Sequence, residues 1–254
     1  MRTFLPDTNV WKYIGKDELL TPKFERALAG GDKFLIGPPA LIELVRGLVR
    51  SGSERFSEDQ KMFSWMKHKE CEILDLTRPF MAKVLRTTLP ANSGVFPQHY
   101  AQLIEMVVNS ASFDEFVQRC KADGSVWREI ESLGQIHEDQ IETQLRALED
   151  LAKQGKDLDI PGRLASTFGA PGCRPIPILV RHRFSAAIEY VETSVRRVAQ
   201  GANPRKNDRG LYVDWQMLMY LAIPDVIFLT NEDFSGEISK SPQKDRIVKP
   251  DTLV

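Results

Sequence analysis

Short apolar runs alternate with amphipathic segments over the first part of the chain. Residues 2–6, 33–37 and 71–75 are apolar runs of strand length, and each is bounded by polar or turn-forming residues. The segments around them place apolar residues three and four positions apart, as in a helix with one buried face. These helices are expected near 10–14, 21–30, 38–48, 58–68 and 79–86. Such alternation of strand and helix predicts a parallel sheet covered by helices.

The pattern changes from about residue 87. Helical periodicity continues without an intervening strand in the segments 97–109, 112–122, 124–132, 136–154 and 184–200. Glycines and prolines crowd residues 155–177, which are therefore expected to form an irregular connection, and residues 201–210 are expected to form a loop. Residues 87–206 are thus predicted to form an all-helical insertion.

Helix and strand alternate again near the C-terminus. A strongly apolar helix is expected over residues 211–222, and strands are expected over 225–229 and near 246–249. Residues 1–86 and 207–254 are therefore predicted to form one α/β domain with a Rossmann-like parallel sheet, interrupted by the helical insertion.

Acidic residues recur close to the ends of the predicted strands. Asp7 directly follows the first strand, Glu43 lies in the helix after the second strand, and Asp214 lies in the first turn of the helix before the fourth strand. Glu232 and Asp233 come just after the fourth strand. In an open parallel sheet, ligands bind beyond the carboxyl ends of the strands. The sequence therefore predicts that carboxylates from distant parts of the chain converge at one edge.

Each of these acids, taken alone, has an ordinary structural explanation. Asp7 can cap the helix that follows it, and Glu43 can form a surface ion pair with Arg46. Asp214 can complement the positive end of its helix dipole. Taken together they indicate more, because clustered carboxylates repel one another and need a counter-cation. A set of oxygen ligands favours Mg²⁺ or Mn²⁺.

Four short motifs of this chain resemble those of the PIN-domain family. The family's D-x-N opening matches Asp7-Thr8-Asn9, and its E-L-x-x-G helix matches Glu43–Gly47. The aspartate that opens the penultimate helix of the family matches Asp214. The closing T-x-D-x-x-F element matches Thr230–Phe234 with two departures, because a glutamate occupies the acidic position and the aromatic residue comes one place early.

The resemblance implies a Mg²⁺- or Mn²⁺-dependent endoribonuclease with a PIN-like sheet, in which metal-activated water hydrolyses phosphodiester bonds. Asp7, Glu43 and Asp214 would hold the metal together with a residue of the last element, for which Asn231, Glu232 and Asp233 are the alternatives. In the interpretation that we carry forward, the metal ligands and catalytic acids are Asp7, Glu43, Asp214 and Glu232, with Asp233 as a further ligand, and the polar supports are Asn9 and Asn231.

The resemblance also implies partners. RNA is the expected substrate, and the family includes toxins that bind a small antitoxin protein and form homodimers. Basic side chains that precede Asp214 or share the helix of Glu43 are candidates for contacts with phosphates: Arg46, Arg205, Lys206 and Arg209. The alternative interpretation is a non-catalytic PIN-like module that binds RNA or protein through a degraded metal site.

Composition limits these alternatives only in part. The chain has 254 residues and a formal net charge of −1, so it is not a uniformly basic nucleic-acid-binding protein. No apolar stretch approaches the roughly 20 residues that span a bilayer, and no secretory signal pattern is seen at the N-terminus. Cys71, Cys120 and Cys173 lie far apart, which fits reduced thiols in a cytoplasmic protein.

Overall fold

The structure, a computed structural model, describes most of the chain. The described residues are 1–14, 16, 20–87, 97–124, 139, 141–153, 159–166, 175–203 and 211–253. Among them, no helix combines the length and the apolar character that crossing a membrane requires.

A five-stranded, all-parallel sheet forms the centre of the molecule, as the alternation of strand and helix predicts. Its spatial order is β3-β2-β1-β4-β5. The strands are β1 Thr3–Pro6, β2 Lys33–Ile36, β3 Glu72–Ile73, β4 Val226–Leu229 and β5 Ile247–Val248. The order runs outward from β1 in both directions, so the topological switch point lies between β1 and β4. Ligands of open parallel sheets bind at such points.

The central strand, β1, is apolar, as expected for a strand of a parallel sheet that helices cover on both faces. Phe4 faces one layer, where its ring stacks on Phe34 at 5.4 Å and Phe34 stacks on Phe24 at 4.7 Å. Leu5 faces the opposite layer, where it lies with Met217 beside Gly37. A Cβ atom at Gly37 would lie 2.7 Å from the Met217 sulfur, so a glycine permits this close approach.

Helices follow the strands where the sequence predicts them. The described helices of the predicted α/β part are α1 Thr8–Tyr13, α2 Leu20–Ala29, α3 Pro38–Ser51, α4 Phe56–His68, α5 Thr77–Leu85 and α13 Leu211–Met219. Short 3₁₀ turns are η1 Gly52–Glu54, η2 Tyr220–Ala222, η3 Lys244–Arg246 and η4 Pro250–Thr252. Together with the sheet they give the Rossmann-like arrangement that was expected.

In its described residues, the segment between the two halves consists of helices joined by turns, without a strand. Its helices are α6 Pro97–Val108, α7 Phe113–Ala122, a helix over 141–153, α9 Ile160–Ser166, α10 Pro177–Arg183 and α11 Ser185–Ala199. The predicted helix 124–132 lies outside the described residues apart from Gly124, and only 201–203 of the predicted loop 201–210 is described.

One prediction for this segment is wrong, and one helix was not predicted. The sequence predicts an irregular connection over 155–177, yet these residues contain α9. Helix α10, which begins at Pro177, is the helix that was not predicted, whereas the helix predicted near 184–200 is present as α11. The prolines caused the error. Pro161 lies in the first turn of α9 and Pro177 opens α10, where a missing N–H costs nothing because first-turn N–H groups lack helical acceptors. Asp159 also accepts a hydrogen bond from the Gly162 N–H at 2.9 Å, as a helix cap does.

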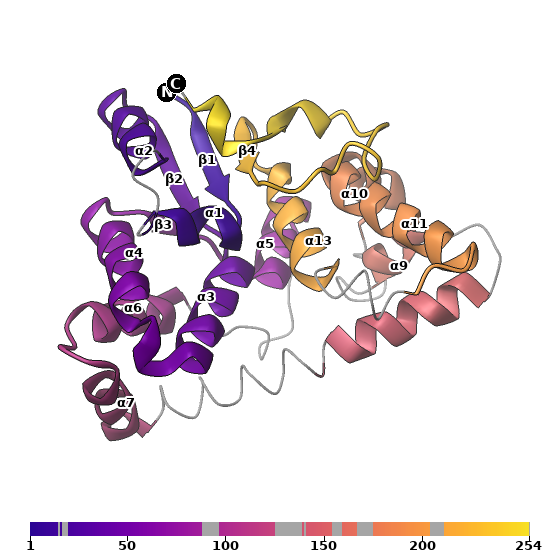
Figure 1. Ribbon diagram of the computed structural model, residues 1–254. Helices are drawn as coiled ribbons and strands as arrows, with labels where there is room; N and C mark the ends of the chain where they lie inside the picture. Colours follow the sequence, from indigo (N-terminus) through magenta and orange to yellow (C-terminus); the bar gives the residue numbers. More distant parts are fainter. Residues whose placement is uncertain are drawn as a thin grey trace.

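These helices pack directly on the α/β part. Helix α6 packs against α4 on one side, and α11 packs against α13 on the other, where α10 also reaches α5 (Figure 1). Their apolar side chains join the same hydrophobic core as the sheet, with Phe116 from α7 and Phe184 beside α11 both fully buried. The helical segment is therefore continuous with the core that positions the strand ends.

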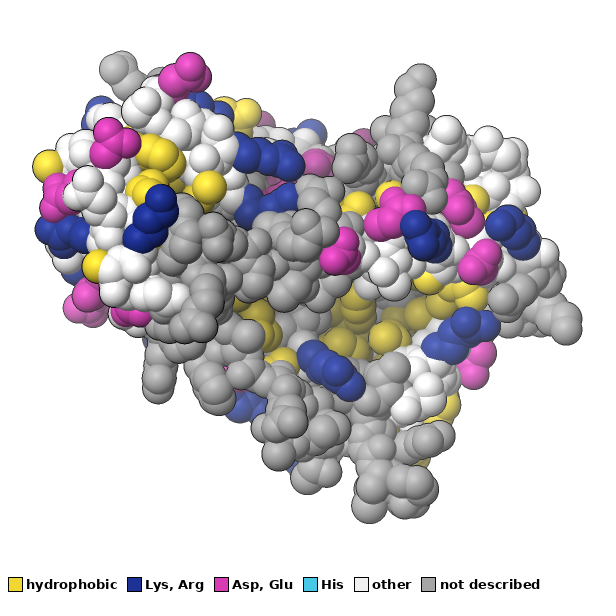
Figure 2. Space-filling view, turned by 90° about the horizontal axis from the view of Figure 1, so that it is seen from below, with side chains coloured by type: hydrophobic (Ala, Val, Ile, Leu, Met, Phe, Trp, Pro, Cys, Tyr) yellow, Lys and Arg dark blue, Asp and Glu magenta, His cyan; other side chains and the backbone are white. Residues whose placement is uncertain are grey.

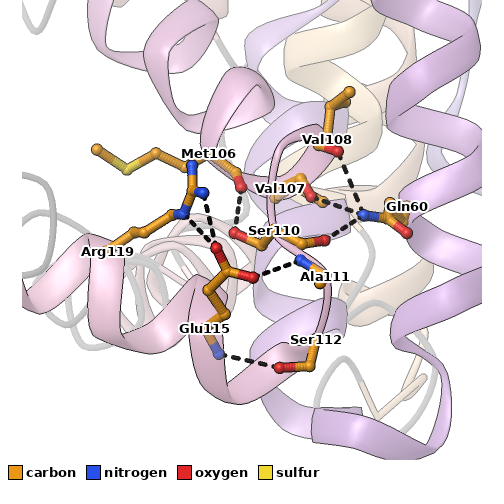
Figure 3. Close-up of polar contacts among 9 residues, drawn as sticks. All are labelled: Gln60, Met106, Val107, Val108, Ser110, Ala111, Ser112, Glu115 and Arg119. Atoms are coloured by element: carbon orange, nitrogen blue, oxygen red, sulfur yellow. Dashed lines mark hydrogen bonds and ion pairs between the residues drawn. The ribbon is translucent and has the colours of Figure 1, made fainter.

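The turn between α6 and α7 is fixed by a polar network (Figure 3). Gln60 of α4 donates from its amide nitrogen to the carbonyl groups of Val107, Val108 and Ser110, the last at 2.6 Å. Ser112 caps α7 by accepting from the Glu115 N–H at 3.2 Å, and Glu115 accepts in return from the Ala111 N–H. This reciprocal pairing satisfies groups that a helix start leaves free.

Gln60→Leu should lower the free energy of unfolding by about 1–3 kcal/mol, because it leaves partly buried carbonyl groups without a donor. Urea unfolding followed by circular dichroism measures the change. The neighbouring exposed Lys61→Ala is the control and should stay within about 0.5 kcal/mol of the parent. Equal stability of Gln60→Leu and the parent would contradict the proposed role of the amide.

Candidate metal centre

Asp7 stands at the switch point, where β1 and β4 end side by side. Its N–H donates to the Leu229 carbonyl at 2.9 Å, which extends the pairing of Pro6 with Leu229 by one residue. Its carboxylate Oδ1 accepts from the Val10 N–H at 2.7 Å, so the helix-cap role expected from the sequence is real. Its Oδ2 accepts from the Thr230 hydroxyl at 2.5 Å. Asp7 therefore joins the first strand, the following helix and the end of β4.

Glu43 reaches the same edge from α3. The hydroxyl of buried Thr8, the residue after Asp7, donates to Glu43 Oε2 at 2.5 Å. Helices α1 and α3 pack against each other, which brings the two residues together although they are 35 positions apart. Among the described residues, Glu43 forms no ion pair with Arg46, so the surface-pair explanation is not what the structure has.

Asp214 lies in the first turn of α13, and Tyr190 of α11 holds its carboxylate. The Tyr190 hydroxyl donates to Asp214 Oδ2 at 2.9 Å. The tyrosine ring is buried and packs edge-on against Phe234 at 5.4 Å. Phe234 belongs to the loop after β4, so one tyrosine contacts two of the elements that carry candidate acids.

Glu232 is placed by Thr230. The buried Thr230 hydroxyl accepts from the Glu232 N–H at 3.0 Å while it donates to Asp7. The chain therefore turns directly after β4, and the Glu232 side chain emerges beside the first strand's end. Its side chain is more exposed than those of the other three acids.

Asp7, Glu43, Asp214 and Glu232 form one electrostatic group, which we call the acidic cluster. Burial raises the pKa of Asp7, against several hydrogen bonds that lower it, and the charge of Glu43 raises it further. Burial also raises the pKa of Asp214 well above its ordinary value, and the charges of Glu232, Glu43 and Asp7 add to the effect. The pKa of Glu232 is raised by burial first, and then by the charges of Asp7 and Glu43.

The acidic cluster lacks a positive partner in the described part of the chain. None of the described Lys, Arg or His side chains forms an ion pair with its members, and three of the carboxylates are held by neutral hydroxyls. Partly buried anions without a counter-charge are costly. A divalent cation would offset this cost, and an all-carboxylate set suits Mg²⁺ or Mn²⁺.

The cluster is not a finished metal cage as it stands. Among the described residues, no group of three or more His, Cys, Asp or Glu side chains is close enough to hold a metal ion without movement. The carboxylates of Glu43 and Asp214 each keep one oxygen that accepts no described hydrogen bond. Rotation of these side chains toward a cation would keep their backbones in place.

Three of the remaining predicted residues, Asp233, Asn9 and Asn231, are described and are not members of the acidic cluster. Asp233 is exposed and accepts from the Ser235 N–H at 2.9 Å, and this bond, together with the charge of Lys249, lowers its pKa. No member of the acidic cluster affects that pKa, so Asp233 is set apart from the cluster. Asn9 and Asn231 have exposed side chains. Arg205, Lys206 and Arg209 lie outside the described residues.

Sequence reasoning missed the hydroxyl donors of Thr8 and Tyr190. Thr8 follows Asp7 directly and is buried, so its position was a usable signal. Tyr190 had none, because it lies in a helix of the predicted insertion and its contact with Asp214 depends on how α11 packs on α13.

Comparison of this chain with family models, curated proteins and solved structures gives no match.

Asp214→Asn should stabilise the protein in EDTA at about pH 7. The raised pKa of Asp214 means that ionisation disfavours the folded state, so parent stability falls as pH rises from the ordinary carboxyl pKa to the folded-state value. Chemical denaturation in EDTA should show the gain near neutrality and its loss near pH 3. A less stable variant at both pH values would contradict the electrostatic account.

Proposed function

We propose that this protein is a metal-dependent nuclease that hydrolyses RNA phosphodiester bonds. One observation carries the proposal: four carboxylates from separate elements couple electrostatically beyond the carboxyl ends of β1 and β4, with no described cation to neutralise them. The resemblance of the D-x-N, E-L-x-x-G and closing motifs to the PIN-domain family supports the same function.

In this proposal, residues of the acidic cluster would hold the metal ion, and neighbouring hydroxyl groups would orient their carboxylates. Glu43 and Asp214 would turn their second oxygens toward Mg²⁺ or Mn²⁺, while Thr8 and Tyr190 keep hold of the first. Asp7 would be fixed by Thr230 and by its helix cap, and Glu232 would complete the set from the exposed side. Bound Mg²⁺ or Mn²⁺ would lower the pKa of a water molecule and offset charge on the phosphate.

RNA as substrate rests on the family resemblance. The face toward which the strands' carboxyl ends point carries basic and acidic side chains side by side, around a hollow lined by hydrophobic groups (Figure 2). Such a mixed face agrees with the net charge of −1 and does not give unselective binding to phosphates. Arg46, on the same helix as Glu43, is our candidate for a phosphate contact from the described residues.

Partners of a toxin type follow from the same resemblance. In this proposal a small antitoxin protein or a second copy of the chain would bind near the acidic cluster and control access to it. Co-purification with the product of a neighbouring short gene would support the toxin form of the proposal. If no such partner is found and the isolated chain is active, the toxin form is rejected and the nuclease function is kept.

A non-catalytic binding module is the second candidate, and two observations favour it. The described acids do not form a ready group of three ligands, and the Thr230–Phe234 element departs from the family motif. In that case Mn²⁺ would leave the melting temperature of the folded protein unchanged. A nuclease should instead gain about 2.7 kcal/mol at a Mn²⁺ concentration 100 times its Kd.

Cleavage of a panel of labelled RNAs with Mn²⁺ or Mg²⁺ tests the nuclease directly. Asp7→Asn and Asp214→Asn should each lower the rate by about 100-fold or more, as loss of a group that positions a catalytic ion does. Asp251→Asn is the matched control and should keep activity near that of the parent, because its exposed carboxylate is not a member of the acidic cluster. Undiminished cleavage by either cluster variant would reject that residue's role.

Tyr190→Phe should move the pH dependence of cleavage upward. In the parent, the hydrogen bond from the Tyr190 hydroxyl lowers the pKa of Asp214. Without this bond the Asp214 carboxylate would ionise, and so bind metal, only at higher pH. We expect a roughly tenfold loss of kcat/KM at neutral pH, recovered in part at alkaline pH.

Tyr220→Phe is the matched control, since it removes a buried hydrogen bond to the Asp75 carbonyl away from the cluster. It should reduce stability without moving the pH profile. If both variants leave the profile unchanged, Tyr190 does not position Asp214.

A further inference from the structure

A cavity adjoins the acidic cluster, and the proposed metal binding does not involve it. Its volume is about 330 Å³, and the loop after β4 and the segment around β5 surround it. Glu232 lines the cavity and also belongs to the acidic cluster, so the two sites share one side chain. Ligand pockets start at about 300 Å³, which is enough for a single nucleotide.

The cavity combines apolar side chains with lysines, serines and the carboxylates of Glu232, Asp233 and Asp245. Phe234 and Ile238 are buried and line it, and Ile247 and Val248 of β5 contribute further apolar surface. Ser239 and the carboxylate of Asp245 are polar groups of its wall. Flat apolar and aromatic surfaces accept the faces of nucleobases, and carboxylates accept hydrogen bonds from ribose hydroxyls and base amino groups.

Two lysines bring positive charge to the same cavity. The Lys249 ammonium group lies 3.3 Å from the Asn231 carbonyl oxygen, and that of Lys244 lies 3.4 Å from the Ser239 carbonyl oxygen. Neither forms an ion pair with a described carboxylate, although the charge of Lys249 is felt by Asp233. Each ammonium has three donors, so both can still bind a phosphate.

We infer that this cavity binds one nucleotide of the RNA, next to the bond that is cleaved. The base would lie against Ile247 and Val248, which line the cavity and are only partly buried, and the phosphate would contact Lys249 and Lys244. Because Glu232 lines the cavity and belongs to the acidic cluster, a nucleotide seated here would bring an adjoining phosphate beside the cluster. The inference rests on the proposed nuclease function, for which this cavity would be a substrate-binding subsite.

Nucleotide binding to the metal-free protein tests this subsite separately from cleavage. Adenosine and uridine 5′-monophosphates are titrated in EDTA, with inorganic phosphate as the comparison. The parent should bind a nucleoside monophosphate at least tenfold more tightly than inorganic phosphate. Lys249→Ala should weaken binding by about tenfold, since it removes one charge-assisted contact.

Lys240→Ala is the matched control. Lys240 is exposed in the same loop but does not line the cavity, so its loss should leave binding unchanged. Ser239→Trp places a large side chain in the wall of the cavity without a change of charge, and it should abolish binding while the protein stays folded by circular dichroism. Equal binding by the parent and both cavity variants, or equal affinity for inorganic phosphate, would overturn the subsite.

Asp214→Asn separates the two proposals. It should keep nucleotide binding and lose cleavage. Retained cleavage together with normal nucleotide binding would reject the catalytic assignment alone, whereas absent nucleotide binding with intact metal-dependent cleavage would reject the subsite alone.

Discussion

The site depends on one hydrogen bond, from the Thr230 hydroxyl to the Asp7 carboxylate. It joins the ends of two parallel strands that lie 223 positions apart in the chain. The pairing of Pro6 with Leu229 sets both residues in place, and a slip of one residue would turn each side chain to the other face of the sheet. Because Thr230 also accepts from the Glu232 N–H, the same hydroxyl fixes the acid that follows.

The charged carboxylates of the acidic cluster destabilise the folded protein, and a bound cation would offset this destabilisation. Burial disfavours the charged forms of Asp7, Asp214 and Glu232, and their mutual repulsion adds to the cost. At the switch point, hydrogen bonds from neutral hydroxyl groups to the carboxylates offset part of this cost. One of these, Tyr190, comes from the helical segment, so this segment contributes to the site as well as to the hydrophobic core. In the function that we propose, a bound divalent ion would offset the rest of this cost.

Much of the sheet and the acids at its edge could be predicted from the sequence, because both leave local signals. Buried parallel strands are short apolar runs, and Asp7 and Glu232 follow such runs almost directly. The helices that contain Pro161 and Pro177 in their first turns could not be predicted, because proline is equally common in turns and in the first turn of a helix. Tyr190 could not be predicted, because its partner is chosen by helix packing rather than by spacing in the chain. The exposure of Asp233 likewise depends on the turn that its own carboxylate makes with the Ser235 N–H.

A crystal structure of the protein soaked in Mn²⁺, with anomalous scattering measured at the manganese edge, tests the central claim most directly. We predict a peak within about 2.0–2.3 Å of oxygens from at least two of Asp7, Glu43, Asp214 and Glu232, at distances normal for oxygen ligands of small divalent ions. An acidic cluster with no anomalous peak at saturating Mn²⁺, in crystals that bind the ion elsewhere, would contradict the account.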